Sequence, residues 1–249
     1  MIKFFRHIRK QLLTENKTGK YIAYAIGEII LVVIGILIAL QINNWNEERT
    51  ARRSEQKLLM SLSEDFKSNL ASLEYSLKII PNLIEEYSLV IEHAGSINDG
   101  LSDNMKDDII VTGFIRTVLV DGTLTSILGS TTLELISNET LKRLLTSYPA
   151  RLRDFKESEN DLIDYVNGVQ RPLFRSYISL SDFLLDDPRF DKFKKNVQKS
   201  DYESLLKNRG FLNSVIGIRS WNKDLLNQCL ELQRQTQEIN LILEDELKN

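Results

Sequence analysis

The sequence predicts an all-α protein, with one N-terminal transmembrane helix followed by an elongated antiparallel helical bundle. Three observations lead to this prediction. Residues 21–42 form an apolar run, later apolar residues recur at spacings of three and four, and no alternating run is long enough for a sheet. Only four prolines interrupt the 249 residues, which favours long helices.

We divide the chain into three parts. Residues 1–19 are expected to form a cytoplasmic basic amphipathic helix, residues 20–44 a transmembrane signal anchor, and residues 45–249 a periplasmic all-helical domain. A chain of 249 residues has room for one anchor and one domain of about 200 residues.

The first part has an apolar face and a basic one. The apolar side chains are Ile2, Phe5, Ile8 and Leu12, and the basic ones are Arg6, Arg9 and Lys10. A helix with this pattern is suited to an anionic membrane surface. A short positive tail before any anchor looks similar, and both interpretations place it in the cytoplasm.

The apolar run, YIAYAIGEIILVVIGILIALQI, contains a single acidic or basic residue, Glu28. As a helix it is about 33 Å long, enough to cross the lipid bilayer, and it has no polar face. Its exit, LQINNWNEE, lacks a small-residue cleavage site, so we expect an uncleaved anchor. Asn43, Asn44 and Trp45 then fall at the membrane interface.

Charge predicts the orientation of the anchor and limits the partners. Six Lys and Arg residues precede it, whereas the basic residues just after it are mixed with acidic ones, which favours a cytoplasmic N-terminus. We therefore expect a bacterial inner-membrane protein with its bulk in the periplasm. Residues 46–249 hold 26 basic against 33 acidic residues, a balance that argues against nucleic acid as a partner.

Small residues recur along the anchor. Ala23, Gly27, Gly35 and Ala39 share a slowly turning stripe, a pattern that lets membrane helices pack closely, and Glu28 points the same way. One interpretation is an oligomer seam that carries a functional carboxyl group. The other is that Gly and Ala are simply common in membrane helices and that Glu28 reaches the headgroups.

A long amphipathic helix is expected over residues 47–95, with coiled-coil-like spacing, a bend near Pro81 and an end at Gly95. The pattern allows it to continue directly from the anchor. Asn69 falls in the apolar seam, where a polar residue can fix the register of a coiled coil. If the seam is buried, replacing Asn69 by Leu should raise stability.

The rest of the chain is expected to alternate helices and connections. First come a polar loop over 96–104, a helix over 107–120, a turn at 121–122 and a short helix ending at Gly129. A cap at Ser137 or Asn138 then begins a helix over 138–180, which is kinked at Pro149 and Pro172. An irregular charged connection over 182–199, a short helix from Ser200 to residues 208–210, and a last helix over 211–247 complete the chain. The Ser and Thr residues of 123–148 suit polar ligand contacts, although local capping explains them equally well.

No catalytic pattern is present. The sequence has no phosphate-binding glycine loop and no zinc-protease motif, and its two histidines, His7 and His93, lie in different parts. We interpret the single cysteine, Cys229, as a small buried apolar side chain. The sequence thus predicts no catalytic residues, no metal site and no cofactor.

The block MIKFFRHIRKQLLTENKTGKYIAYAIGEIILVVIGILIALQINNWNEER resembles the N-terminus of an uncharacterised family of single-pass membrane proteins from Bacteroidota-type Gram-negative bacteria. The stretch ILGSTTLELISNETLKRLLTSY is similar to that family's central element, with Gly-Ser-Thr in place of Ser-Ser-Gly. The resemblance implies location and architecture but no activity. It places Glu28, Gln41, Asn43, Asn44 and Trp45 within the family's signature block.

These observations predict a membrane-anchored, non-enzymatic scaffold or protein-interaction module. We expect it to form a homo-oligomer, or to pair with another membrane protein, through the anchor. Two alternatives stay open: a periplasmic ligand-sensing helical bundle, and an accessory subunit of a proton-driven membrane complex that uses Glu28.

Overall fold

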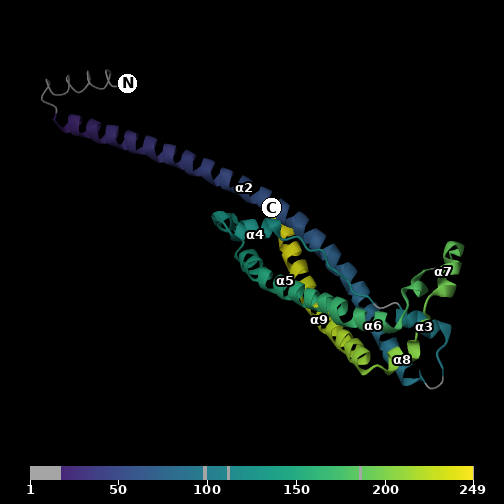
Figure 1. The fold of residues 1–249 in the computed structure, drawn as a ribbon. Coiled ribbons are helices and arrows are strands. Elements are labelled where there is room, and N and C mark those ends of the chain that lie inside the picture. Colours follow the sequence, from purple (N-terminus) through teal and green to yellow (C-terminus); the bar gives the residue numbers. More distant parts are fainter. Residues whose placement is uncertain (1–17, 98–99, 111–112, 185–186, 249) are drawn as a thin grey trace. The chain divides into compact units, whose positions relative to one another are not determined.

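A computed structural model describes residues 18–97, 100–110, 113–184 and 187–248 (Figure 1). Every regular element among them is helical, which confirms the predicted all-α class. Contacts divide the chain into two units, Met1–Lys57 and Leu58–Asn249, which we describe separately. The expected amphipathic helix of residues 1–19 lies almost entirely outside the described residues.

The helices have the following bounds. They are α2 Thr18–Gly95, α3 Asp103–Ile110, α4 Gly122–Leu128, α5 Glu139–Tyr165, α6 Arg171–Tyr177, α7 Asp191–Asn196, α8 Tyr202–Lys207 and α9 Arg209–Glu246. The described residues also form short turns: the 3-10 turns η2 Thr131–Leu135, η4 Leu180–Phe183 and η5 Pro188–Phe190, and the π turn η3 Val166–Gln170. The helix α2 includes both the apolar run and the helix expected over 47–95, and Pro81 lies inside it.

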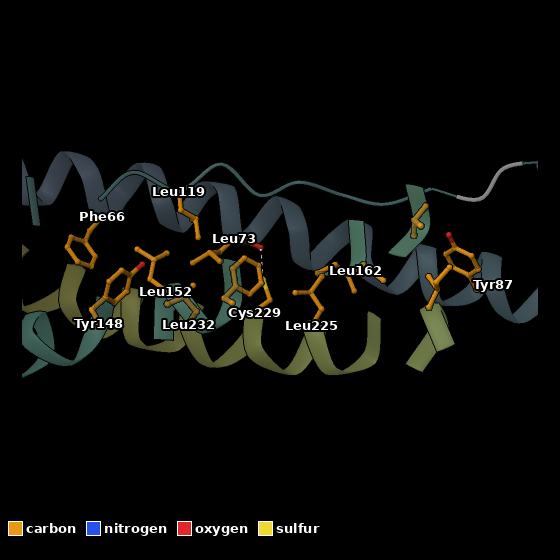
Figure 2. Packing of buried hydrophobic residues seen from close by; sticks show 14 of the residues in the cluster. Phe66, Leu73, Tyr87, Leu119, Tyr148, Leu152, Leu162, Leu225, Cys229 and Leu232 are labelled. Carbon is orange, nitrogen blue, oxygen red and sulfur yellow. Dashed lines mark hydrogen bonds between the residues drawn. The ribbon is translucent and has the colours of Figure 1, made fainter. Parts of the chain in front are cut away.

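The core of the second unit lies between three long helices: α2 from Leu58 onward, α5 and α9. The helix α9 runs antiparallel to α5, because the Tyr148 hydroxyl group meets that of Thr236 at 3.0 Å while the rings of Tyr165 and Trp221 lie 4.9 Å apart. Figure 2 shows the buried side chains between these helices, including Phe66, whose ring packs edge-on against Tyr148 at 4.9 Å. The predicted antiparallel packing is thereby confirmed for α5 and α9.

Asparagine side chains begin both α5 and α9. The Asn138 carboxamide oxygen accepts a hydrogen bond from the backbone N–H of Leu141 at 2.9 Å, so Asn138 is the cap, one of the two candidates that the sequence offered. Asn208 caps α9 in the same way, through the N–H of Phe211 at 2.9 Å. The short helix expected from Ser200 is capped instead by Asp201, which accepts from the N–H of Ser204 at 2.9 Å.

Two expected elements differ in detail. The helix predicted over 138–180 divides into α5, the π turn η3 and α6, with Pro149 inside α5 and Pro172 in the first turn of α6. The connection over 182–199 is not wholly irregular, because it contains η5 and α7 in addition to the end of η4. Pro172 can follow η3 because the first turn of a helix needs no backbone donor there.

The helix predicted over 107–120 is wrong for residues 113–120. Residues 113–120, which we call the strap, have no helical structure. Side chains of the strap alternate: Thr117 and Leu119 are buried, whereas Val118 is 72% exposed and Val120 is 41% exposed. Figure 2 shows Leu119 pointing from the strap into the core between α2 and α5. This is the pattern of an extended segment, with a repeat of two residues.

Side chains of α2 hold the strap along its length. The Tyr87 hydroxyl group donates to the carbonyl oxygen of Gly113 at 3.0 Å, and the hydroxyl groups of Ser76 and Thr117 lie 2.8 Å apart. At the other end, the Asn69 amide donates to the Val120 carbonyl oxygen and accepts from the Val120 N–H, both at 2.7 Å. The strap therefore runs antiparallel to α2.

Length explains why the strap is extended. Between Asn69 and Tyr87, α2 rises about 27 Å, at 1.5 Å per residue. The seven steps from Gly113 to Val120 cover about 23 Å when extended, but only about 11 Å as a helix. Only an extended chain brings both ends of the strap to their partners. Ile115, Thr117 and Val118 are β-branched, which favours this conformation.

On the opposite side, α5 contributes a buried carboxylate. Glu159 is 3% exposed, and one of its oxygens accepts from the Thr117 N–H at 2.8 Å and from the Thr117 hydroxyl group at 2.7 Å. Burial raises the pKa of Glu159, and the hydrogen bonds from Thr117 act in the opposite direction. Arg116 and Lys156 add favourable charge nearby.

The structure also corrects the role expected for Asn69. This residue is buried as the sequence suggested, but its amide pairs with the backbone of the strap instead of fixing the register between two helices. A leucine at this position would leave the backbone N–H and carbonyl groups of Val120 without these partners. The expected sign of the Asn69→Leu substitution therefore reverses, from stabilising to destabilising.

Candidate functional site: the apolar segment of α2 and the clefts of the helical domain

The apolar segment of α2 exposes its large side chains. Between residues 22 and 42, thirteen Ile, Leu and Val side chains keep 47–64% of their surface exposed. A core helix would bury one face of such a run, and this segment buries none in the described structure. The segment is long and apolar enough to span a membrane.

The predicted packing stripe lies within this segment. A Cβ atom placed on Gly27 or Gly35 would meet no other atom within 4 Å, and Ala39 is exposed. Ala23 lies in α2, but its side chain is outside the described part. Glu28 is partly exposed on the same helix. The stripe is thus open to a second helix, although its role as a packing face stays a prediction.

Polar pairs begin where the apolar run ends. The Asn43 amide donates to Glu47 at 2.7 Å, and the Arg49 guanidinium lies 5.8 Å from the centre of the Trp45 ring. Asn44 and Trp45 are exposed. Pairs four residues apart lie on one face of a helix, so these contacts are local. Their position agrees with the predicted interfacial role, which stays a prediction.

In the second unit, a charged cleft of about 580 Å³ lies between α3 and the segment that precedes α8. Its charged lining residues are Asp103, Lys106, Asp107, Asp182, Lys194 and Lys199. Asp182 organises one wall, because its carboxylate accepts from the hydroxyl groups of Ser200 at 2.6 Å and Tyr202 at 2.7 Å. Burial and the neighbouring Asp182 raise the pKa of Tyr202, so its phenol stays a donor.

A second cleft, of about 370 Å³, lies beside the π turn η3. Its lining residues are Ile110, Gln170, Arg171, Phe174, Arg175, Leu180 and Phe183. We call it the arginine cleft, since both of its charged residues are arginines. Three of the lining residues, Gln170, Arg171 and Phe174, come from the end of η3 and the start of α6. The five-residue turn η3 thus contributes to the positions of both arginines.

Reactive groups are scattered. His93 pairs with Asp108 at 2.9 Å, and Cys229 is fully buried, as the sequence predicted. Burial and the nearby Glu159 raise the pKa of the Cys229 thiol to about 12. In the ranges that the structure describes, no three His, Cys, Asp or Glu side chains are grouped as a metal site would require.

Sequence reasoning missed the strap, the buried Glu159 and both clefts. The β-branched run of residues 115–120 was a usable signal for the strap. Nothing in the sequence marked the clefts, because their linings come from segments that are far apart in the chain and are joined by irregular turns.

Comparison with known proteins gives one similarity. Residues 28–109 match the model of a family of unknown function, DUF6090. This range begins at Glu28, contains the rest of the apolar segment and most of α3, and ends before the strap. No curated protein and no solved structure matches the chain significantly. The match therefore supports the N-terminal resemblance and assigns no activity.

Proposed function

We propose that this protein is a membrane-anchored, non-enzymatic interaction module whose residues 20–44 span a lipid bilayer. One observation supports this most strongly: thirteen large apolar side chains stand exposed on one continuous helical segment. Removing a large aliphatic side chain fully from water is worth about 1.5–3 kcal/mol. For thirteen half-exposed side chains, the cost of contact with water is on the order of 10 kcal/mol or more, comparable with the whole stability of a domain.

The proposed orientation places the N-terminus in the cytoplasm and residues 45–249 in the periplasm of a bacterial inner membrane. The excess of Lys and Arg before the anchor supports this orientation. In this arrangement, the helical domain would present its surface to periplasmic partners. The open stripe of Gly27, Gly35 and Ala39 would pair with a second copy or with another membrane helix.

Membrane extraction tests the anchoring. The full chain should stay with the membrane pellet after alkaline carbonate treatment and should enter solution with mild detergent. A double variant, Val33→Asp with Ile34→Asp, should be released by carbonate, because two charges at the centre of the segment oppose insertion. The matched control is Ile216→Asp with Leu241→Asp, two exposed apolar positions on α9, which should stay in the pellet.

A reporter fused after Asn249 tests the orientation. We expect activity from a reporter that works only in the periplasm and none from one that works only in the cytoplasm. Release of the wild-type chain by carbonate would refute the anchor. The opposite reporter result would refute the orientation alone.

A second candidate function, ligand sensing by the helical domain, is favoured by the charged cleft and the arginine cleft of the second unit. In that case, occupation of a cleft would change the stability or the partner contacts of the domain. A non-enzymatic role predicts that a bound ligand is not chemically altered by the protein. Recovery and analysis of the ligand after incubation with the purified protein checks this.

A further inference from the structure

The arginine cleft combines positive charge with apolar walls. Arg171 and Arg175 are four residues apart on α6 and therefore lie on one face of it. Among the described residues, no carboxylate lines the cleft. Two like charges at this spacing repel each other, and an anion placed between them would relieve the repulsion. The charge of the lining residues therefore favours a negatively charged ligand.

Arg171 is held in place before any ligand arrives. Its guanidinium donates to the Asn167 carboxamide oxygen at 2.7 Å and lies 5.0 Å from the centre of the Phe114 ring in the strap. Asn167 belongs to η3, and π turns occur frequently at functional sites. Neither contact neutralises the charge. Arg171 thus offers a fixed cation with remaining N–H donors.

Arg175 is exposed and uncommitted. Within the described ranges, no hydrogen bond or ion pair engages its guanidinium, unlike that of Arg171. An arginine in this state can present two parallel N–H groups to a carboxylate. Arg171 is therefore held in position by its neighbours, whereas the side chain of Arg175 can move toward a ligand.

Apart from Gln170, the other described lining residues of the cleft are apolar, and two of them are exposed. Phe183 is 46% exposed and Leu180 is 53% exposed, both on η4. The Phe183 ring packs edge-on against Phe174 at 6.2 Å between centroids. A cavity of about 370 Å³ falls within the size range of small-molecule sites. An aromatic or compact aliphatic group placed there would cover surface that is now exposed to water.

We propose that the arginine cleft binds a small organic anion, specifically a carboxylate attached to a compact apolar body. The carboxylate pairs with Arg175 and Arg171, and the apolar body lies against Phe174, Leu180 and Phe183. A bare inorganic anion would leave the apolar walls exposed to water, so it is not the best ligand. A cation is disfavoured because both arginines would repel it. The proposal concerns the second unit alone and does not depend on membrane anchoring.

Fluorine NMR tests this directly. The full chain, in nanodiscs of zwitterionic lipid, is titrated with 4-fluorophenylacetate, and the ¹⁹F shift and line width are followed to saturation. Two matched probes separate the contributions: 4-fluorophenylacetamide has the ring without the charge, and trifluoroacetate has the charge without the ring. We expect saturable binding of 4-fluorophenylacetate, with at least tenfold weaker binding of both matched probes.

Variants locate the site. Arg175→Gln should weaken binding at least tenfold, because it removes an exposed guanidinium without disturbing the core. Arg143→Gln, an exposed arginine of α5 outside the cleft, should bind like the wild type. Phe183→Ala should weaken binding of 4-fluorophenylacetate and leave that of trifluoroacetate unchanged. Circular dichroism of each variant should match the wild type.

Four results would overturn the proposal. These are no saturable binding of 4-fluorophenylacetate up to millimolar concentrations, equal binding of the uncharged amide, equal binding of trifluoroacetate, and an unchanged affinity in Arg175→Gln. Repeating the titration in nanodiscs with anionic phosphatidylglycerol distinguishes the source of the anion. Unchanged affinity supports a soluble ligand, whereas strong competition assigns the cleft to a lipid headgroup and overturns the soluble-ligand assignment.

Discussion

The carboxamide of Asn69 pairs with both backbone groups of Val120, donating to its carbonyl oxygen and accepting from its N–H, each at 2.7 Å. An amide side chain carries the same donor and acceptor as a peptide group, so one asparagine can replace a neighbouring strand at that position. Asn69 is 1% exposed and Val120 is 41% exposed, so the bonds are shielded from water on the side of the asparagine. The end of the strap is therefore fixed to α2 by a single side chain.

Replacing Asn69 by leucine should lower the free energy of unfolding by about 1–3 kcal/mol, because two backbone groups of the strap lose their hydrogen-bond partners. Thermal unfolding of the full chain in mild detergent, followed by circular dichroism, measures the change. Asn213→Leu, at an exposed position of α9, is the matched control and should change stability little. Equal stability of wild type and Asn69→Leu would show that these bonds contribute nothing.

Glu159 should make stability depend on pH. Its pKa is raised by burial above the ordinary value of 4.5, so the folded protein holds this proton at pH values where the unfolded chain has lost it. Between the two pKa values, stability therefore falls as pH rises. Glu159→Gln keeps an acceptor for Thr117 and cannot ionise. As pH rises above about 4.5, the variant should therefore become progressively more stable relative to the wild type. Unfolding curves of both proteins at several pH values measure this difference, and a constant difference would contradict it.

The cap at Asn138 should contribute measurably. Asn138→Ala removes the acceptor of the Leu141 N–H and the contact with Glu246 at 2.7 Å, and should cost about 1 kcal/mol. Asn138→Asp keeps the acceptor and adds a charge beside Glu246, so it should restore the cap but not that contact. The test is the same thermal unfolding, in which the Asp variant should lie between wild type and Asn138→Ala.

The stripe of the anchor should mediate association. Gly35→Ile should weaken it by blocking close approach, whereas Glu28→Gln should largely preserve it by keeping a donor and an acceptor. A bacterial membrane reporter of helix association, carrying the isolated anchor, measures both variants. If Gly35→Ile and Glu28→Leu associate like the wild type, the stripe is not a packing face. Loss of function with intact association in Glu28→Gln would indicate proton handling instead.

Much of the fold follows from local pattern, and its failures have a physical cause. The apolar run predicted the first part of α2, and the caps at Asn138 and Gly129 were visible because their partners lie three or four residues away. The strap was missed because spacings of three and four in Ile110, Phe114 and Thr117 also fit a helix. Tertiary partners decided the conformation, and they lie 26 to 51 residues away along the chain.

The predicted site residues were located but not assembled by the sequence. Gly27, Gly35, Ala39 and Glu28 needed only helical geometry to be placed on one segment. The arginine cleft joins the end of α3, the π turn and η4, whose approach depends on irregular turns that no periodicity describes. The charges of Arg171 and Arg175 point to an anion only once the described lining of the cleft is seen to contain no carboxylate.

The strap has a consequence for the order of folding. The surface that binds the strap forms only after α2 and α5 have come together. Its residues Asn69 and Ser76 lie on α2, and Glu159 lies on α5. If the strap bound α2 before α5 was in place, closing the 51-residue loop between Asn69 and Val120 would cost chain entropy, and few contacts would offset that cost. Docking of the strap should therefore follow the transition state. Substitutions such as Thr117→Val should then accelerate unfolding in stopped-flow measurements while leaving the refolding rate nearly unchanged.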